Sequence, residues 1–276
     1  MTISVQTNSA ALVALQNLNK TAGDLQQAQN IISTGLSINS AKDNASVWAI
    51  AQAQRADVSA LSAVQSSLDR ASSIASVAQT AGQSVSDLLN QIKQKVVAAQ
   101  DPSLDANSRA AINTDFKSLL TQISDVVNNA SFDGANILNG SLSGDISFLA
   151  NADATSFITL SVKDMSLGGA IITMASTDSI GTLTAAQGVL TEINNSIANV
   201  NSALGDVGAQ SKQIDSHNIF VGKLSDVLTQ GIGNLVDADM AKESAKLQAL
   251  QVQQQLGVQA LSIANSSPQI VLSLFK

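Results

Sequence analysis

Apolar residues recur at alternating spacings of four and three positions along most of this chain, which is typical of helices that pack side by side. The longest series runs from Val64 to Ala99 and predicts one long coiled-coil helix. A second long helix is predicted by the series from Ala186 to Leu235. Between them, the series from Ile112 to Val126 predicts a helix that begins after a break at Pro102, because the residue before a proline is pushed out of helical geometry.

Both ends of the chain carry the same apolar spacing but no charge. Residues 1–19 and residues 247–275 contain no charged side chain. The C-terminal stretch is too rich in Gln, Asn and Ser to enter hydrocarbon, so we expect no membrane insertion. Its apolar residues form two stripes on different sides of a helix, and a helix of this kind needs several protein neighbours. The first stripe is Ala245, Ala249, Val252, Leu256 and Ile263, and the second is Leu247, Leu250, Leu261 and Ala264.

The N-terminal segment matches the C-terminal one in spacing and in its lack of charge, so we pair the two ends as partner helices. Apolar side chains of this pair are the expected assembly contacts. In the N-terminal helix they are Leu15, Leu18, Leu25 and Ile32, and in the C-terminal helix they are Leu250, Val252, Leu256, Leu261, Ile263, Leu272 and Leu274. Gly35 is expected to end the first helix, and Ser40 with Asp43 is expected to cap the start of the next.

The middle of the chain has a different pattern. Residues 132–144 are rich in Gly and Asn, and they are followed by three short apolar runs, DISFLA, SFITLSV and GGAIITMA, which predict strands. The predicted fold is therefore mainly α, a long antiparallel coiled-coil rod with paired terminal helices and a small β-containing insert. Its expected segments are 1–41 and 237–276 for the terminal helices, 42–130 and 183–236 for the two halves of the rod, and 131–182 for the insert.

Composition agrees with slim, closely packed helices, since the chain is 45% hydrophobic but only 3% aromatic. The net charge is -7 and the chain has no basic stripe, so we expect no nucleic-acid partner. The chain has no cysteine and one histidine, His217, which excludes thiolate chemistry and a paired-histidine zinc site. No nucleotide-binding glycine motif occurs either. We therefore expect no enzyme, no cofactor and no metal.

Trp48 and the pair Asp237 and Asp239 can each be interpreted as structural or as chemical. Trp48 could be a ligand platform, but an isolated indole on a helix more often anchors one segment against another, and we expect a packing anchor. Asp237 and Asp239 lack further ligands nearby, so we interpret them as a connector and helix cap. The first residues lack a positively charged region and a continuous apolar core, so no cleavable secretory signal is evident.

Three stretches resemble the bacterial flagellins: SAKDNASVWAIA at residues 40–51, SFDGANILNG at 131–140, and QALSIANSSPQIVLSLFK at 259–276. The Trp48 variant is similar to flagellins of the alphaproteobacterial kind. Asn44 departs from the pattern, since the family usually has a second Asp there. The resemblance implies a subunit that polymerises into the flagellar filament for swimming motility, with the terminal helices forming an inner tube and the rods an outer tube.

The resemblance also implies partners and a location. The partners are other copies of the chain and other flagellins, a flagellar export chaperone that holds the C-terminal helix, and the hook-filament junction and cap proteins. The chain is expected to leave the cell unfolded through the flagellar secretion channel and to reside in the extracellular flagellum. Two alternatives stay open: a hook-filament junction protein, and a secreted coiled-coil effector or adhesin that forms discrete oligomers.

An energetic argument independent of the family favours a polymer. Ordering about thirty residues costs on the order of tens of kcal/mol, and isolated helices of this kind are marginal in water. We therefore expect the tails to be largely disordered in the monomer and to fold among neighbouring copies, while the rod is already formed.

Overall fold

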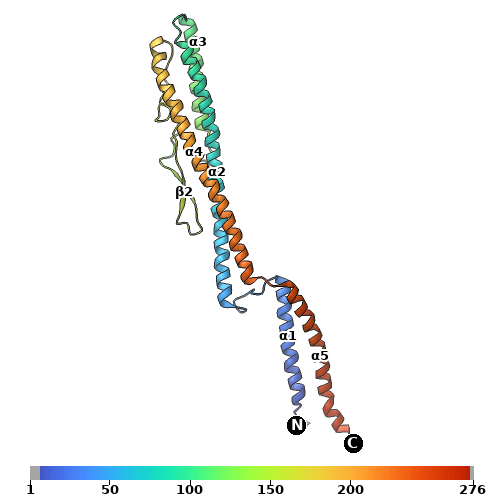
Figure 1. Ribbon diagram of the computed structural model, residues 1–276. Coiled ribbons are helices and arrows are strands. Elements are labelled where there is room, and N and C mark those ends of the chain that lie inside the picture. The colour runs from blue at the N-terminus through green and yellow to red at the C-terminus, as the bar shows by residue number, and fades with distance from the viewer. Residues whose placement is uncertain (1–6, 274–276) are drawn as a thin grey trace. The chain divides into compact units, whose positions relative to one another are not determined.

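The structure is a computed structural model that describes residues 7–273, and for residues 267–273 it describes the backbone alone. The helices are α1 (Ser9–Thr34), α2 (Ala45–Ala99), α3 (Ala106–Asn129), α4 (Leu183–Val236) and α5 (Met240–Ser273), and one hairpin contains β1 (Ile146–Leu149) and β2 (Phe157–Leu160) (Figure 1). The mainly α fold with a small β insert is confirmed. The chain forms two compact units, residues 57–226 and residues 1–56 with 227–276.

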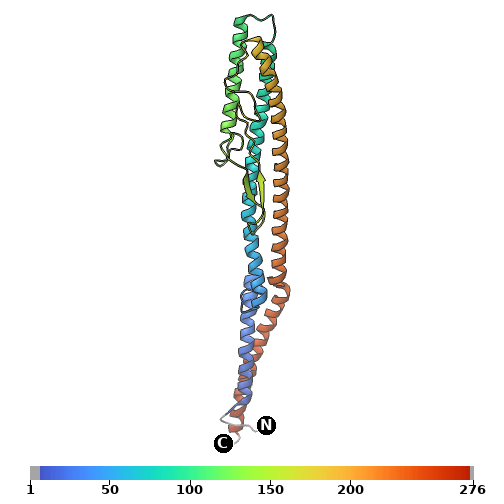
Figure 2. The ribbon, with the colours of Figure 1, turned by 90° about the vertical axis from the view of Figure 1, so that its left-hand side faces the viewer.

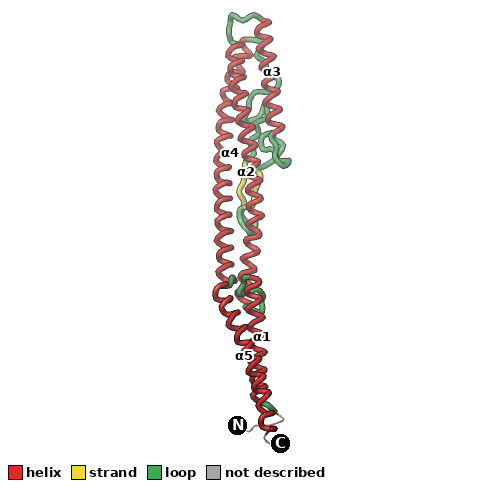
Figure 3. Tube along the Cα trace, turned by 90° about the vertical axis from the view of Figure 1, so that its right-hand side faces the viewer, coloured by secondary structure: helices red, strands yellow, loops and turns green. Residues whose placement is uncertain are grey.

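The core of the 57–226 unit is the predicted apolar stripe of α2. All its members are buried, namely Val64, Leu68, Ala71, Ala75, Ala78, Gly82, Val85, Leu89, Ile92, Val96 and Ala99. The facing residues of α4 lie seven positions apart and are also buried, namely Ile193, Val200, Val207, Ile214 and Val221. This spacing is the coiled-coil repeat that the sequence predicts. Figure 3 shows α2 between α3 and α4.

Helix α3 packs on the C-terminal half of α2 (Figure 3). Phe116, Leu120, Ile123 and Val127 are buried, so the inward face passes through Val127 and not through Val126, which is half-buried. Asp105 caps the first turn by accepting from the Ser108 backbone N–H at 2.6 Å. That hydrogen bond favours the carboxylate and lowers the pKa of Asp105.

The start of α2 differs from the prediction that Ser40 caps it. The helix begins at Ala45, and the side-chain oxygen of Asn44 accepts from the Val47 backbone N–H at 3.2 Å. Asp43 instead reaches backwards and accepts from the backbone N–H groups of Ser40 and Asn39, which lowers the pKa of its carboxyl. Ser40 donates its hydroxyl to the same carboxylate, so it closes a turn before the helix and cannot cap it.

The other predicted helix boundaries are confirmed. Gly35 has a left-handed φ of 73° and donates its N–H to the Ile31 carbonyl oxygen at 2.8 Å, as a helix-ending glycine does. Helix α4 ends at Val236, directly before the Asp pair. The Asp239 carboxylate accepts from the Ala241 and Lys242 backbone N–H groups, so it caps α5.

The insert has fewer strands than the sequence predicts. β1 and β2 form an antiparallel pair in which Phe148 lies opposite Ile158. The third predicted strand, residues 168–175, is irregular, although Ile172 and Met174 are buried. Its backbone groups find partners on α4, where Ser196 accepts from the Thr173 N–H at 3.0 Å and Asn199 donates to the Ile171 carbonyl at 3.2 Å. Because side chains of α4 satisfy these groups, the segment needs no neighbouring strand.

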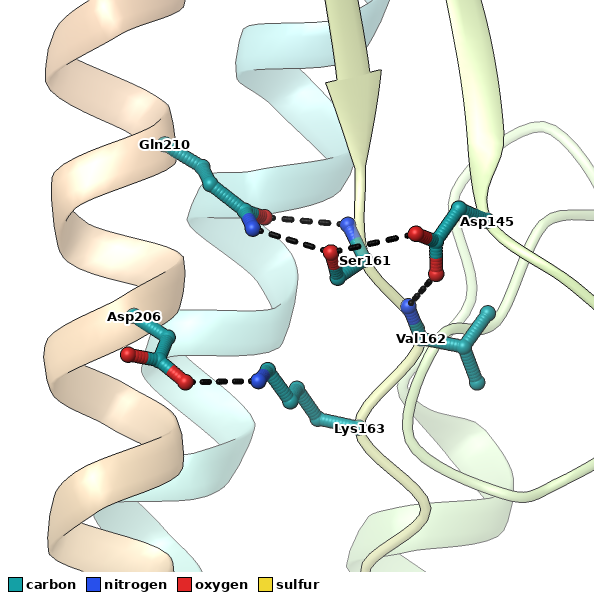
Figure 4. Close-up of polar contacts among 6 residues, drawn as sticks. All are labelled: Asp145, Ser161, Val162, Lys163, Asp206 and Gln210. Carbon is teal, nitrogen blue, oxygen red and sulfur yellow. Dashed lines mark hydrogen bonds and ion pairs between the residues drawn. The ribbon is translucent and has the colours of Figure 1, made fainter.

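Polar side chains fasten the hairpin to the rod (Figure 4). Gln210 of α4 accepts from the Ser161 backbone N–H at 2.9 Å and donates to the Ser161 hydroxyl at 3.0 Å. Lys163 pairs with Asp206 of α4 at 2.6 Å. Asp145 accepts from the Val162 N–H at 3.0 Å, which fixes the chain as it leaves β2. The insert is therefore a fixed part of the 57–226 unit.

The Gly- and Asn-rich stretch before the hairpin ends α3. Asn136 is buried and donates to the Val127 carbonyl at 2.8 Å, and its side-chain oxygen accepts from the Leu138 N–H at 2.8 Å. Gly134 beside it has a φ of 76°, a conformation that glycine adopts without strain. The stretch is recognisable from its composition, but composition alone does not indicate that Asn136 is the residue that binds the Val127 carbonyl at the end of α3.

Candidate assembly site of the terminal helices

Helices α1 and α5 pack against each other, which confirms the pairing of the two ends (Figures 1 and 2). Each helix carries buried or half-buried positions that alternate at spacings of three and four. On α1 they are Ala11, Ala14, Leu18, Thr21, Leu25, Ala28 and Ile32, and on α5 they are Leu247, Leu250, Gln254, Gly257, Leu261 and Ala264. The second predicted stripe of α5 is thus the one that faces α1.

At Gly257 the two helices lie close together. A Cβ atom added there would lie 3.2 Å from Leu18 Cδ1 and 4.0 Å from the Leu18 Cα. Further along the pair, Asn8 accepts from the Ala11 N–H and donates to the Ala264 carbonyl at 2.7 Å, so one side chain caps α1 and binds α5. Sequence analysis singled out neither residue, because a glycine and an asparagine interrupt an apolar pattern.

The first predicted stripe of α5 is uncovered. Val252, Leu256 and Ile263 have exposed fractions of 55%, 64% and 62%. On α1, Leu15 is 43% exposed, so it lies off the inward face on which the predicted spacing placed it. Since isolated exposed apolar residues are ordinary but a continuous row is not, this stripe is a candidate contact surface.

The other predicted site residues fall into three groups. Leu18, Leu25, Ile32, Leu250 and Leu261 are buried or half-buried in the α1–α5 pair. The side chain of Leu272 and the whole of Leu274 lie outside the described residues. Trp48 is half-buried in the first turn of α2, and its role as a packing anchor stays a prediction.

The α1–α5 pair carries few charged side chains. Lys20 and Asp24 lie in the middle of α1. Lys242, Glu243 and Lys246 lie in the first two turns of α5, where Lys246 and Glu243 form an ion pair at 3.2 Å. Beyond Lys246, α5 has only neutral side chains. In residues 7–273, no group of three or more His, Cys, Asp or Glu side chains could hold a metal ion. No helix in this part of the chain has the length and apolar content needed to cross a bilayer.

Solved structures share this fold. A crystal structure of Bacillus cereus flagellin matches 56% of this chain and 87% of its own with a TM-score of 0.50 and 17% identity. A putative flagellar hook-associated protein from Vibrio parahaemolyticus matches 71% of this chain and 100% of its own with a TM-score of 0.56 and 16% identity. At these identities the likeness concerns the fold alone.

Sequence comparison identifies the family. The bacterial flagellin N-terminal helical region matches residues 5–143, and the bacterial flagellin C-terminal helical region matches residues 190–275. Flagellin FljJ of Caulobacter vibrioides is 52% identical over 100% of this chain and 99% of its own. A flagellin of Brucella melitensis is 41% identical over 99% of both chains. With the paired neutral helices and the coiled-coil rod, these matches show that the chain belongs to the bacterial flagellins, the structural subunits of the flagellar filament.

Proposed function

We propose that the α1–α5 pair completes its packing only among copies of itself, and that both helices fold as the subunit joins the filament. The observation that carries this proposal is the uncovered row of Val252, Leu256 and Ile263 on the part of α5 after Lys246, which has no charge. Burial of a Val, Leu or Ile side chain contributes about 1.5–3 kcal/mol, so this row gains several kcal/mol per subunit when neighbours cover it. Neutral amides between the apolar residues allow close packing without stacking like charges.

The 57–226 unit contributes a preformed rod to this process. Its buried stripes on α2 and α4 already satisfy each other within one chain. The α1–α5 pair has only one of its two faces covered, so ordering it is opposed by chain entropy until neighbours arrive. We propose the five segments 1–41, 42–130, 131–182, 183–236 and 237–276 as the working division of the subunit, with the first and last acting together in assembly.

The same surface accounts for partners before assembly. An exposed apolar helix face in the cell invites premature association, and an export chaperone on the C-terminal helix would cover it. We propose passage of the unfolded chain through the flagellar channel without cleavage of its N-terminal sequence, and contacts with the junction and cap proteins at the filament ends. We assign the chain no enzymatic activity, no catalytic residue and no cofactor.

Hydrogen exchange during seeded growth tests the proposal. In the monomer, amides of α1 and α5 are expected to exchange orders of magnitude faster than those of α2 around Leu89, because unsupported helices open readily. In filaments grown from seeds, α1 and α5 should become as protected as the rod. Equal protection of α1 and α5 in the monomer would contradict folding on assembly.

The same growth assay separates the alternative functions. A filament subunit elongates seeds without help from other proteins. A junction protein should bind seeds without elongating them, and an effector or adhesin should give only small closed assemblies by light scattering.

A glycine replacement tests the α1–α5 contact. Gly257→Leu should push α1 away from α5, because even the first added carbon lies 3.2 Å from Leu18 Cδ1. We expect seeded growth to slow at least about tenfold, which corresponds to ~1.4 kcal/mol per added subunit. Gly257→Ala should be milder, since the tip of Leu18 can shift. Gly23→Leu on α1 is the matched control, because nothing lies within 4 Å of an added Cβ there. Unchanged growth of Gly257→Leu would show that close approach at this point is unimportant.

A further inference from the structure

The 57–226 unit carries an open apolar groove between α2 and α3. Its volume is about 370 Å³, and Val77, Thr80 and Ala81 of α2 line it together with Val126 and Ala130 of α3. A second hollow continues it in the direction of Asp87 and Asp125, and shares Val126. We call this surface the α2–α3 groove. The first hollow is mostly apolar, and the second hollow, nearer the C-terminus of α2, is lined mostly by polar residues, among them Asp87 and Asp125.

Helix α4 of the same unit carries an exposed apolar face. Ile219 and Phe220 are 61% and 56% exposed, although both are large apolar side chains. Lys212 lies seven residues before Ile219, so both side chains lie on the same side of α4. We call Lys212, Ile219 and Phe220 the α4 face.

The groove and the α4 face cannot meet within one chain. Figures 2 and 3 show α3 and α4 on opposite sides of α2 along the part of the rod that α3 covers. Hydrogen bonds from Ser72 to Asp215 and from Asn218 to Asp69 hold α4 at its own side of α2. In the described part of the chain, the side chains of Lys212, Asp87 and Asp125 form no ion pair. The charged side chains of both surfaces are therefore available for an ion pair with a second copy, and the ring contact of Phe220 is with His217 of its own helix.

The spacing on the two surfaces matches. From Thr80 in the apolar part of the groove to Asp87 at its acidic end is seven residues of helix, and from Ile219 to Lys212 is also seven. Seven residues rise about 10.5 Å along an α-helix. If Ile219 of one copy enters another copy's groove beside Thr80, Lys212 reaches the level of Asp87 and Asp125. The carboxylates of Asp87 and Asp125 then face the Lys212 ammonium group across the contact.

The match also sets the relative direction of the two copies. Helices α2 and α4 run antiparallel in the rod, as the bonds pairing residue 72 with 215 and residue 69 with 218 require. Residue numbers therefore increase along α2 in the direction in which they decrease along α4. Thr80 to Asp87 and Ile219 to Lys212 thus point the same way along the rod, so the two copies dock in parallel.

We propose that the α4 face of one subunit docks into the α2–α3 groove of a second copy of this chain, with Ile219 and Phe220 in the apolar part and Lys212 beside Asp87 and Asp125. The α4 face of each subunit binds one neighbour, and its α2–α3 groove stays open for the α4 face of another. The contact therefore propagates and does not close a dimer. This inference rests on the proposed filament function and names a contact between rods within it.

Cysteine cross-linking tests the contact, since the chain has no cysteine of its own. Ile219→Cys subunits and mass-tagged Thr80→Cys subunits are mixed, grown into filaments and mildly oxidised. We expect a covalent heterodimer in filaments and none in the unassembled mixture. The matched control replaces the second subunit with Asn107→Cys, an exposed position at the opposite end of α3, and should give at least tenfold less heterodimer.

Charge reversal gives a second readout that does not depend on cysteine geometry. Lys212→Glu should slow seeded growth several-fold, as should Asp87→Lys with Asp125→Lys, and combining all three changes should restore much of the rate. Normal filaments that give no Ile219–Thr80 cross-link above the control would overturn this contact and leave the filament function intact. Failure of the unmodified chain to elongate seeds would instead reject the function itself.

Discussion

Filament growth is expected to stop when Val252→Asp and Leu256→Asp are combined in one chain. Both side chains lie on the uncovered stripe of α5 and are more than half exposed in the single subunit. In the proposed filament they are surrounded by neighbouring copies, and burying an unpaired carboxylate costs several kcal/mol at each site. The cost recurs in every subunit, so seeded elongation followed by light scattering and electron microscopy should show no growth.

The controls for this variant lie on the same helix. Gln251→Asp with Gln255→Asp adds the same charge at exposed positions outside the apolar stripe, and should impair growth less. Val252→Ala with Leu256→Ala removes apolar area without adding charge, and should raise the subunit concentration needed for growth. Wild-type elongation by the Val252→Asp, Leu256→Asp chain would show that this stripe is not buried. Equal loss from the glutamine pair would assign the effect to charge alone.

Phe116→Ala is expected to cause the largest loss of rod stability among simple truncations. Phe116 is fully buried and is the largest side chain with that property in the described core. Removing most of an aromatic side chain leaves a cavity, and such changes cost about 3–5 kcal/mol. Urea unfolding of the monomer, monitored by circular dichroism, measures this cost on the 57–226 unit, where Phe116 lies.

Val97→Ala serves as the control for Phe116→Ala. Val97 is an exposed apolar residue of α2, so its truncation should change the free energy of unfolding by less than about 0.5 kcal/mol. A loss below about 1 kcal/mol for Phe116→Ala would mean that α3 can close over the cavity. The packing of α3 on the rod would then be looser than its burial indicates.

Helix content and the rod core could be predicted from local sequence. The stripe from Val64 to Ala99 repeats so regularly that one helical face is apolar whatever its partner is, and every member is buried. Gly35 could be identified as a helix end because its conformational freedom is a property of the residue. One prediction failed because a side chain had two possible partners. Ser40 was expected to cap α2, but the carboxylate of Asp43 binds its hydroxyl and backbone first.

The terminal helices show which features follow from the sequence and which need the tertiary structure. The sequence by itself determined that the ends are neutral, helical and matched, and that α5 has two apolar faces, since these follow from composition and periodicity. Only the tertiary structure decided which face α1 covers. That choice depends on Gly257, where the missing side chain lets α1 approach closely, and on Asn8 binding the Ala264 carbonyl. Such close approaches depend on the shapes of both helices together, and a periodic pattern in either helix alone does not contain them.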